Sequence, residues 1–324
     1  MHAIRLFVPA IAGVCLHLNL VAAVTVPETF SANPSSNGWR THGDASFFTW
    51  NATNQNLEVT WDSRQTNSYF HRPIGTILSR HDDFALSFDL RLLDVEIGVN
   101  PGKQFTFQIA AGFINYNSAT NDNFPRGTGT DSPNLVTFDY FPDSGFGASV
   151  APGVVSRSNE FAFGFLVYEI TNEPVHVEMR YSAGAQTLTT VVTTNGVAST
   201  PVENVLGSTF TDFRLDTLSI NSYSDAGQHP DFAGSILAHG IIDNLVLTLP
   251  APPVQMFTGA FSNGVWITTF QSQTNWLYAL ERTASFQSWA KVATAAGTGQ
   301  SLTLQDNSPP APAQAFYRIR AERP

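Results

Sequence analysis

The chain has 324 residues, 43% of them hydrophobic and 13% charged, with a formal net charge of -10 at pH 7. Residues 24–250 hold ten Lys or Arg against 23 Asp or Glu, and Lys103 is the single lysine among them. Because such an acidic surface repels phosphate backbones, the composition argues against nucleic acid as a partner. The one cysteine, Cys15, excludes a disulfide framework within the chain and a zinc–thiolate site.

The first 23 residues have the pattern of a secretory signal peptide. Arg5 precedes an apolar stretch, Leu6–Ala23, that has no acidic residue and ends in small side chains. His17 and Asn19 interrupt the stretch, which makes it a poor membrane span. We therefore predict cleavage near Ala23 and a mature protein that is secreted, or held at the cell surface or in the periplasm, without a membrane span. Lipid attachment at Cys15 is the alternative.

Beyond the signal segment the dominant hydrophobic period is two. Apolar and polar side chains alternate along Phe84–Leu92 and again along Val175–Tyr181, as in strands with one buried face. Further strands are predicted at 57–61, 105–110, 135–141, 161–167, 188–194, 213–220 and 241–249. Asn195-Gly196 is a hairpin signal, and no long segment has helical spacing. The pattern predicts an all-β fold, an antiparallel β-sandwich or jelly roll.

A long polar loop is predicted over Phe113–Arg126. It combines an aromatic ring with amide groups, which suit the apolar face and the hydroxyl groups of a sugar. Loops of this length in a compact domain are often functional, although an ordinary polar loop is the alternative. The candidate carbohydrate-binding residues are Asn115, Tyr116, Asn117 and Arg126, together with Tyr140.

Residues 134–145 read Asn-Leu-Val-Thr-Phe-Asp-Tyr-Phe-Pro-Asp-Ser-Gly. This segment resembles the metal-binding strand and loop of the legume-type lectins in the concanavalin A-like superfamily. In those lectins a valine-rich strand leads into Glu-x-Asp-x-aromatic-Pro-Asn. The order of long strands on both sides is similar too, so the resemblance spans residues 40–250. It implies a concanavalin A-like β-sandwich whose sugar-binding loops are braced by calcium and a transition metal.

The resemblance implies three candidate metal ligands in this sequence. Asp139 matches the aspartate ligand, Phe141 the residue that offers its carbonyl, and Asp143 the asparagine ligand. Thr137 stands where the family has its glutamate, which argues against the transition-metal site. Because calcium takes six to eight oxygen ligands, these three groups predict only a weak calcium site completed by water. The alternative is a tight turn that starts at Pro142 and binds no ion.

Glucanases of the same superfamily have a similar strand that carries the pattern Glu-x-Asp-x-x-Glu. Here those places hold Thr137, Asp139 and Pro142. Retaining hydrolysis needs two carboxyl groups about 5 Å apart, so glucanase activity is not expected.

The chain after the last long strand forms a second unit. Residues 250–256 begin with Pro250-Ala251-Pro252-Pro253, and proline cannot continue a sheet ladder. We predict one domain over 24–249, this linker, and a small β domain over 257–324 that resembles a module at the C-termini of many exported bacterial proteins. Its strands are expected at 265–270, 277–281, 302–304 and 316–321. Trp266, Trp276 and Trp289 are expected in its core.

The leading hypothesis is an exported, non-catalytic, lectin-like protein that binds an extracellular glycan. A structural or surface-adhesion protein without a small ligand is the first alternative. A glycan-active hydrolase or lyase with unrecognised catalytic residues is the second.

Overall fold

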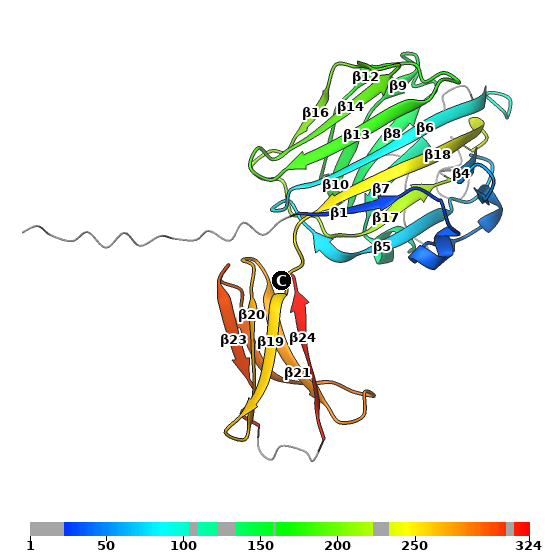
Figure 1. The fold of residues 1–324 in the computed structure, drawn as a ribbon. Helices are drawn as coiled ribbons and strands as arrows, with labels where there is room; N and C mark the ends of the chain where they lie inside the picture. The colour runs from blue at the N-terminus through cyan, green and yellow to red at the C-terminus, as the bar shows by residue number, and fades with distance from the viewer. Residues whose placement is uncertain (1–22, 104–108, 122–133, 158–159, 223–232, 309–313) are drawn as a thin grey trace, which may run out of the picture.

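The computed structural model describes residues 23–103, 109–121, 134–157, 160–222, 233–308 and 314–324 (Figure 1). Nearly all the regular structure is strand, and the one α-helix of the described ranges is the single turn α1 (Tyr116–Ala119). No helix within these ranges is long and apolar enough to cross a membrane. Arg126, most of the predicted signal peptide and most of the predicted strand at 105–110 lie outside the described residues.

Two nine-stranded antiparallel sheets, a back and a front sheet, form a sandwich. The back sheet contains β1 (Val24–Glu28), β3 (Phe48–Asn51), β4 (Asn56–Asp62), β6 (Phe84–Ile97), β13 (Val175–Ser182), β14 (Thr187–Thr194), β15 (Val197–Ala198), β16 (Val202–Val205) and β18 (Ile236–Leu249). The front sheet contains β2 (Arg40–His42), β5 (Tyr69–Leu78), β7 (Ile109–Ile114), β8 (Leu135–Phe141), β9 (Ser149–Val150), β10 (Gly153–Arg157), β11 (Glu160–Phe163), β12 (Leu166–Val167) and β17 (Leu215–Asn221). The predicted antiparallel β-sandwich is therefore confirmed.

The order of the strands determines which residues become neighbours on each sheet. The back sheet runs β15-β14-β13-β6-β18-β4-β3, and the front sheet runs β11-β10-β8-β7-β17-β5-β2. The inward faces of both sheets bury one hydrophobic core. Phe88 of the back sheet, for example, meets Phe138 of the front sheet edge to face at a ring separation of 5.6 Å. This core holds the front sheet in place and leaves its outer face free to carry polar side chains.

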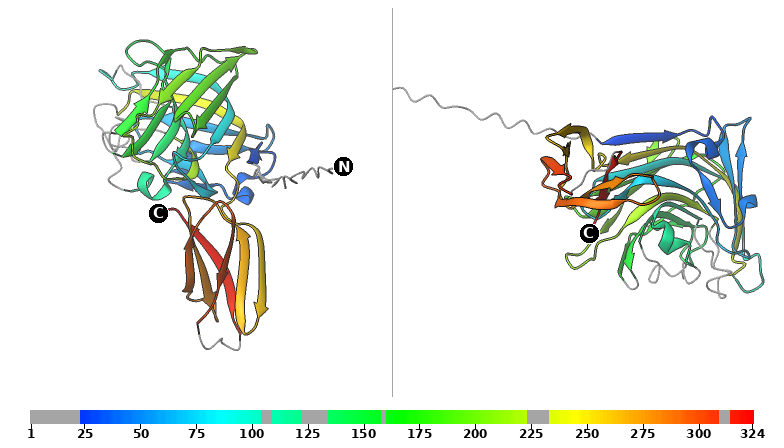
Figure 2. Two further views of the ribbon diagram at one scale, coloured as in Figure 1. Left: turned by 90° about the vertical axis from the view of Figure 1, so that its left-hand side faces the viewer. Right: turned by 90° about the horizontal axis from the view of Figure 1, so that it is seen from below.

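The C-terminal strands form a separate body below the sandwich in the view of Figure 1, and Figure 2 shows it from two further sides. We call it the C-terminal module. One of its sheets contains β19 (Gln255–Ser262), β20 (Val265–Gln271) and β23 (Ser301–Gln305), and the other contains β21 (Leu277–Thr283), β22 (Ala290–Ala296) and β24 (Phe316–Glu322).

The core of the C-terminal module contains Trp276 and has Trp266 packed against it. Trp289 departs from the expectation. It lies outside that cluster, half-buried, with the guanidinium carbon of Arg318 4.1 Å from its ring centre and the exposed Phe286 beside it.

Most predicted strands are found, but several strands of the structure were not predicted, among them β10, β19 and β22. β5, ten residues long, is the longest of the unpredicted strands. The strand predicted at 161–167 is divided into β11 and β12, with Gly164 and Phe165 between them. Gly164 lies close to Val202, since an added Cβ would be 2.3 Å from a methyl carbon of that residue. Of the strand predicted at 105–110, only residues 109 and 110 are described; they belong to β7, which continues to Ile114.

Candidate functional site

A line of paired residues crosses the front sheet from its β2 edge. The register pairs Arg40 with His71, His71 with Ser219, Ser219 with Gly112, Gly112 with Thr137, and Thr137 with Gly153. Directly paired residues of neighbouring strands share one face of a sheet. An adjacent line runs through His42, Tyr69, Asn221, Ala110 and Asp139. Both lines are rich in polar side chains.

These two lines lie on the outer face of the front sheet. Alternate residues of the same strands, such as Phe70, Ile220 and Phe138, belong to the core between the sheets, and successive side chains of a strand point to opposite faces. Arg40 of β2 is thereby brought beside His71 of β5. Asp216 and Thr217, near the start of β17, line the same groove as these two residues.

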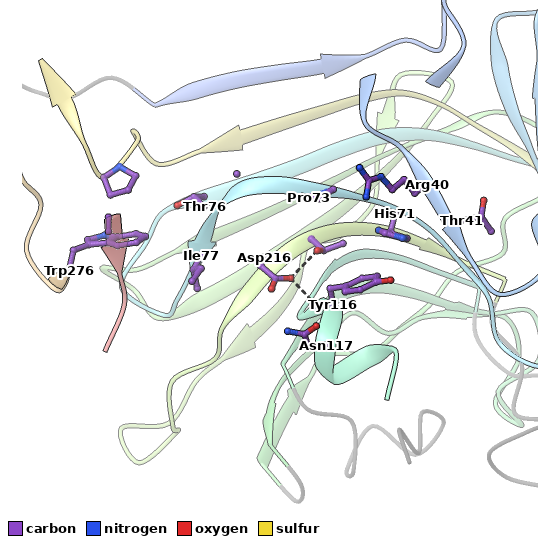
Figure 3. A pocket seen from close by; sticks show the side chains of 14 residues that line it. Arg40, Thr41, His71, Pro73, Thr76, Ile77, Tyr116, Asn117, Asp216 and Trp276 are labelled. Carbon is purple, nitrogen blue, oxygen red and sulfur yellow. Dashed lines mark hydrogen bonds between the residues drawn. The ribbon is translucent and has the colours of Figure 1, made fainter. Parts of the chain in front are cut away.

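A groove of about 600 Å³ lies over this part of the sheet, lined by residues of β2, β5, β17 and α1 (Figure 3). Its volume falls within the ~300–1,000 Å³ of typical ligand sites. Arg40 and His71 lie toward one end of the view, and Asp216, Tyr116 and Asn117 lie in the middle. The groove therefore joins the polar lines of the sheet to the helical turn.

Tyr116 has its backbone fixed over the groove from two sides. Asn115 caps α1, with its Oδ1 accepting from the Ser118 backbone N–H at 3.0 Å. The backbone N–H of Tyr116 donates to Asp216 Oδ1 at 2.9 Å. That carboxylate oxygen also accepts from the Thr217 hydroxyl at 2.9 Å. Cap and carboxylate together hold the start of α1 against β17.

The His71 ring packs against the Tyr116 ring in the lining of the groove, with ring centres 4.7 Å apart. The His71 side chain is almost fully buried, at 6% exposure, and its Nδ1 has no hydrogen-bond partner among the described residues. Burial lowers the pKa of His71, and the nearby His42 and Arg40 lower this pKa further. At neutral pH the ring is therefore uncharged and offers one donor and one acceptor, a combination that suits a hydroxyl group.

The candidate carbohydrate-binding residues are divided between several places. Tyr116 and Asn117 line the groove, whereas the side chain of Asn115 serves as a helix cap. Arg126 lies outside the described residues. Tyr140 is 2% exposed in the sandwich core, where its hydroxyl accepts from the Ile170 backbone N–H at 3.0 Å. A ring packed there has no face for a sugar, so we exclude Tyr140 from the candidate site.

The candidate metal ligands make contacts typical of a strand and a turn. Asp139 is buried on β8, and its Oδ2 accepts from the Thr137 hydroxyl at 2.9 Å. Asp143 Oδ1 accepts from the Gly145 backbone N–H at 2.9 Å, a contact within the turn that follows Phe141. Within the described ranges no three His, Cys, Asp or Glu residues gather as a metal-binding group. These donors do not fit a calcium shell of six to eight oxygens, and we assign no metal chemistry to them.

No protein-family model matches this sequence, and no curated protein matches it. Among solved structures, the chain is similar to peanut lectin in complex with a 9mer peptide, at 18% identity and a TM-score of 0.44, over 71% of this chain and 100% of the lectin. It is similar to a legume lectin-like domain from Entamoeba histolytica, at 9% identity and a TM-score of 0.45, over 68% of this chain and 95% of that domain. It is also similar to the alginate lyase Aly36B, at 10% identity and a TM-score of 0.37, over 69% of this chain and 96% of the lyase.

Legume lectins, the family that residues 134–145 resemble, are thus among the similar structures. At such low identities the likeness concerns the fold alone. The site assignment rests on the strand register and the groove.

Proposed function

We propose that the protein binds a glycan in the groove over the outer face of the front sheet. The observation that carries the proposal is the convergence of His71, Tyr116 and Asp216 from three separate elements onto one groove. One of the legume lectins of similar fold was determined in complex with galactose.

The groove has the chemistry that sugar recognition needs. Tyr116 supplies an aromatic ring for the apolar face of a pyranose. Asn117 and the uncharged His71 offer donors and acceptors for hydroxyl groups. Because the sandwich as a whole is acidic, it repels polyanions at long range. We therefore propose a neutral glycan. Calcium has no part in this proposal.

The proposal is non-catalytic binding. Asp216 is the one carboxylate among the described residues that line the groove, and it already accepts two hydrogen bonds. Glycoside hydrolysis generally requires a pair of carboxyl groups on either side of the scissile bond.

One observation favours a second candidate, a lyase acting on a uronic-acid glycan. An uncharged histidine beside a tyrosine, with Arg40 lining the same groove, has the groups that β-elimination needs. His71 would take the proton from the carbon that bears the uronate carboxylate. Arg40 would pair with that carboxylate. The Tyr116 hydroxyl would give its proton to the leaving oxygen as the C–O bond breaks, which produces an unsaturated sugar and consumes no water.

The test is affinity electrophoresis through gels that contain β-glucan, mannan, xylan, galactan, alginate or pectate. We expect a neutral polysaccharide to retard the wild type, and His71→Ala and Tyr116→Ala to weaken that binding about tenfold, equivalent to about 1.4 kcal/mol. His176→Ala is the matched control, because that exposed imidazole lies on the back sheet and pairs with Asp89. Equal retardation of all four proteins would contradict the site. Release of unsaturated uronate from alginate or pectate would favour the lyase.

We also propose that the protein is exported, to the medium, the cell surface or the periplasm. The support is the signal-peptide pattern of residues 1–23. N-terminal sequencing of the protein recovered from these compartments is expected to start near Val24, and an intact Met1 there would contradict cleavage.

A further inference from the structure

The C-terminal module forms one end of the groove. Pro253, Trp276 and Ala321 line the same cavity as His71 and Tyr116, and Trp276 lies at the end opposite to Arg40 in Figure 3. The carbonyl of Pro253 accepts from the Tyr278 hydroxyl at 2.7 Å. This end of the groove is therefore built on the module, with the linker residue Pro253 held against the module's core residue Tyr278.

Arg323, near the C-terminus, fastens the module to the sandwich. Its guanidinium pairs with Asp82 at 2.5 Å, and the two side chains are only 4% and 9% exposed. It also donates to the Ser79 hydroxyl at 2.6 Å and lies over the Trp276 ring, 4.6 Å from the ring centre. Breaking a buried ion pair is costly, because one charge is left without a partner. Arg323 thus holds Trp276 in place at the end of the groove.

Two buried polar atoms at this end lack partners among the described residues. They are the hydroxyl oxygen of Thr76 on β5 and the indole nitrogen of Trp276, and both residues line the groove. A buried polar atom left without a hydrogen bond costs about 1–3 kcal/mol. An indole N–H only donates, while a threonine hydroxyl both donates and accepts. A hydroxyl-rich ligand that reaches this end is suited to satisfy both atoms after a small local opening.

We propose that the groove takes a neutral glycan chain, not a single sugar, and that the chain extends from the His71–Tyr116 corner to Thr76 and Trp276. The C-terminal module is then part of the binding site. Trp276 contributes its N–H edge, while its ring remains in the module core under Arg323. This inference rests on the proposed glycan-binding function and adds the length of the ligand and the role of the module.

The test is calorimetric titration with size series of β-glucan, mannan, xylan and galactan oligosaccharides, each from monosaccharide upward. For the series that binds, we expect the wild-type Kd to fall with length until the chain reaches Trp276. Full-length Thr76→Val/Trp276→Phe removes the two polar atoms; valine keeps the shape of threonine, and phenylalanine keeps a smaller aromatic ring in the module core. It should lose about tenfold in affinity for the long members, equivalent to about 1.4 kcal/mol, and should bind the short members as the wild type does.

A second variant, Arg323→Met, releases the ion pair without touching the sandwich side of the groove. It should weaken long-chain binding only, and melting curves verify that each variant is folded. Equal affinity of wild type and double variant for long members, or an equal loss for short and long members, would overturn the inference and leave glycan binding intact. If no series binds the wild type, the proposed function itself fails, and the inference fails with it.

Discussion

His71 is the residue whose chemistry depends most on its surroundings. Arg40 is its paired neighbour on β2, the Tyr116 ring packs against it, and His42 is near enough to lower its pKa, so a proton on its ring would be buried beside positive charge. Because the folded-state pKa is lowered, the unfolded chain takes up this proton first as the pH falls below the ordinary value of about 6.5. The stability that the neutral ring contributes is complete above that pH and is lost as the pH falls toward the folded-state pKa.

We therefore expect the wild type to lose more unfolding free energy than His71→Gln between about pH 7.5 and about pH 5.5, a window on either side of the ordinary histidine pKa. Urea unfolding at both pH values measures this. His176→Gln, which alters an exposed imidazole of the back sheet, is the matched control. Parallel losses in wild type and His71→Gln would show that the ring is not held neutral by the fold.

Asp139 and Asp143 give the second prediction at this scale. Each already accepts a hydrogen bond from its own strand or turn, so neither depends on a cation for a partner. We expect the melting temperature to be the same in chelator and in about 5 mM calcium, a concentration above the affinity range of weak extracellular sites. A calcium-dependent rise that Asp139→Asn/Asp143→Asn abolishes would restore the metal site that the lectin resemblance implies.

Single residues also show what sequence could reveal about the site. Tyr116 and Asn117 were within reach, because an aromatic ring beside amides in a polar segment is a visible pattern. Arg40, His71 and Asp216 stand alone in their segments, and each resembles an ordinary polar residue of a strand. Only the order β2-β5-β17 brings them together, and that order depends on contacts between distant parts of the chain.

At the scale of elements, β8 and β5 show why one strand was predicted and the other was not. β8 spans Leu135–Phe141 as predicted, because its core-facing side chains recur with period two. In β5 the polar His71, then Pro73 and Gly75, interrupt that signal. Proline is tolerated at Pro73 because β2 pairs only with Tyr69–His71, which leaves the strand edge beside Pro73 unpaired. The features that hide β5 in the sequence are those that line the groove.

Gly112 of β7 gives a prediction about strand packing. An added Cβ would lie 2.4 Å from the Val136 carbonyl oxygen and 2.7 Å from the Thr137 Cα, both backbone atoms that cannot rotate away. We expect Gly112→Ala to lower the unfolding free energy by about 1–3 kcal/mol, as overpacking does. Urea unfolding measures this loss. Gly207→Ala is the control, since nothing lies within 4 Å of its added Cβ. Equal stability of the two variants would mean that β7 and β8 are less closely packed than described.

At the scale of the whole molecule, the sequence predicted the antiparallel sandwich and most strands after the prolines, because hydrophobic period and turn residues are local signals. The contact between sandwich and module was not predictable. It rests on Asp82 and Arg323, which are 241 positions apart and unremarkable in their own segments. The position of the module at the groove gives it a direct part in the proposed site.

A competing surface exists elsewhere on the sandwich. Phe161, Phe163 and Phe165 are exposed along and just beyond the edge strand β11, and Phe146, 82% exposed, lies beside Phe165. Exposed aromatic rings of this kind are a second place where a glycan could stack. Binding in the groove and binding at this aromatic edge would therefore cover different side chains.

Side-chain oxidation footprinting with and without the best-binding polysaccharide of the electrophoresis panel distinguishes binding in the groove from binding at the aromatic edge. Hydroxyl radicals modify aromatic rings that solvent reaches, so a bound glycan protects the rings that it covers. We predict that the half-buried Tyr116 becomes protected and that Phe146 and Phe163 are oxidised as in the free protein. Protection of Phe146 and Phe163 with Tyr116 unchanged would contradict the account and assign glycan binding to the aromatic edge.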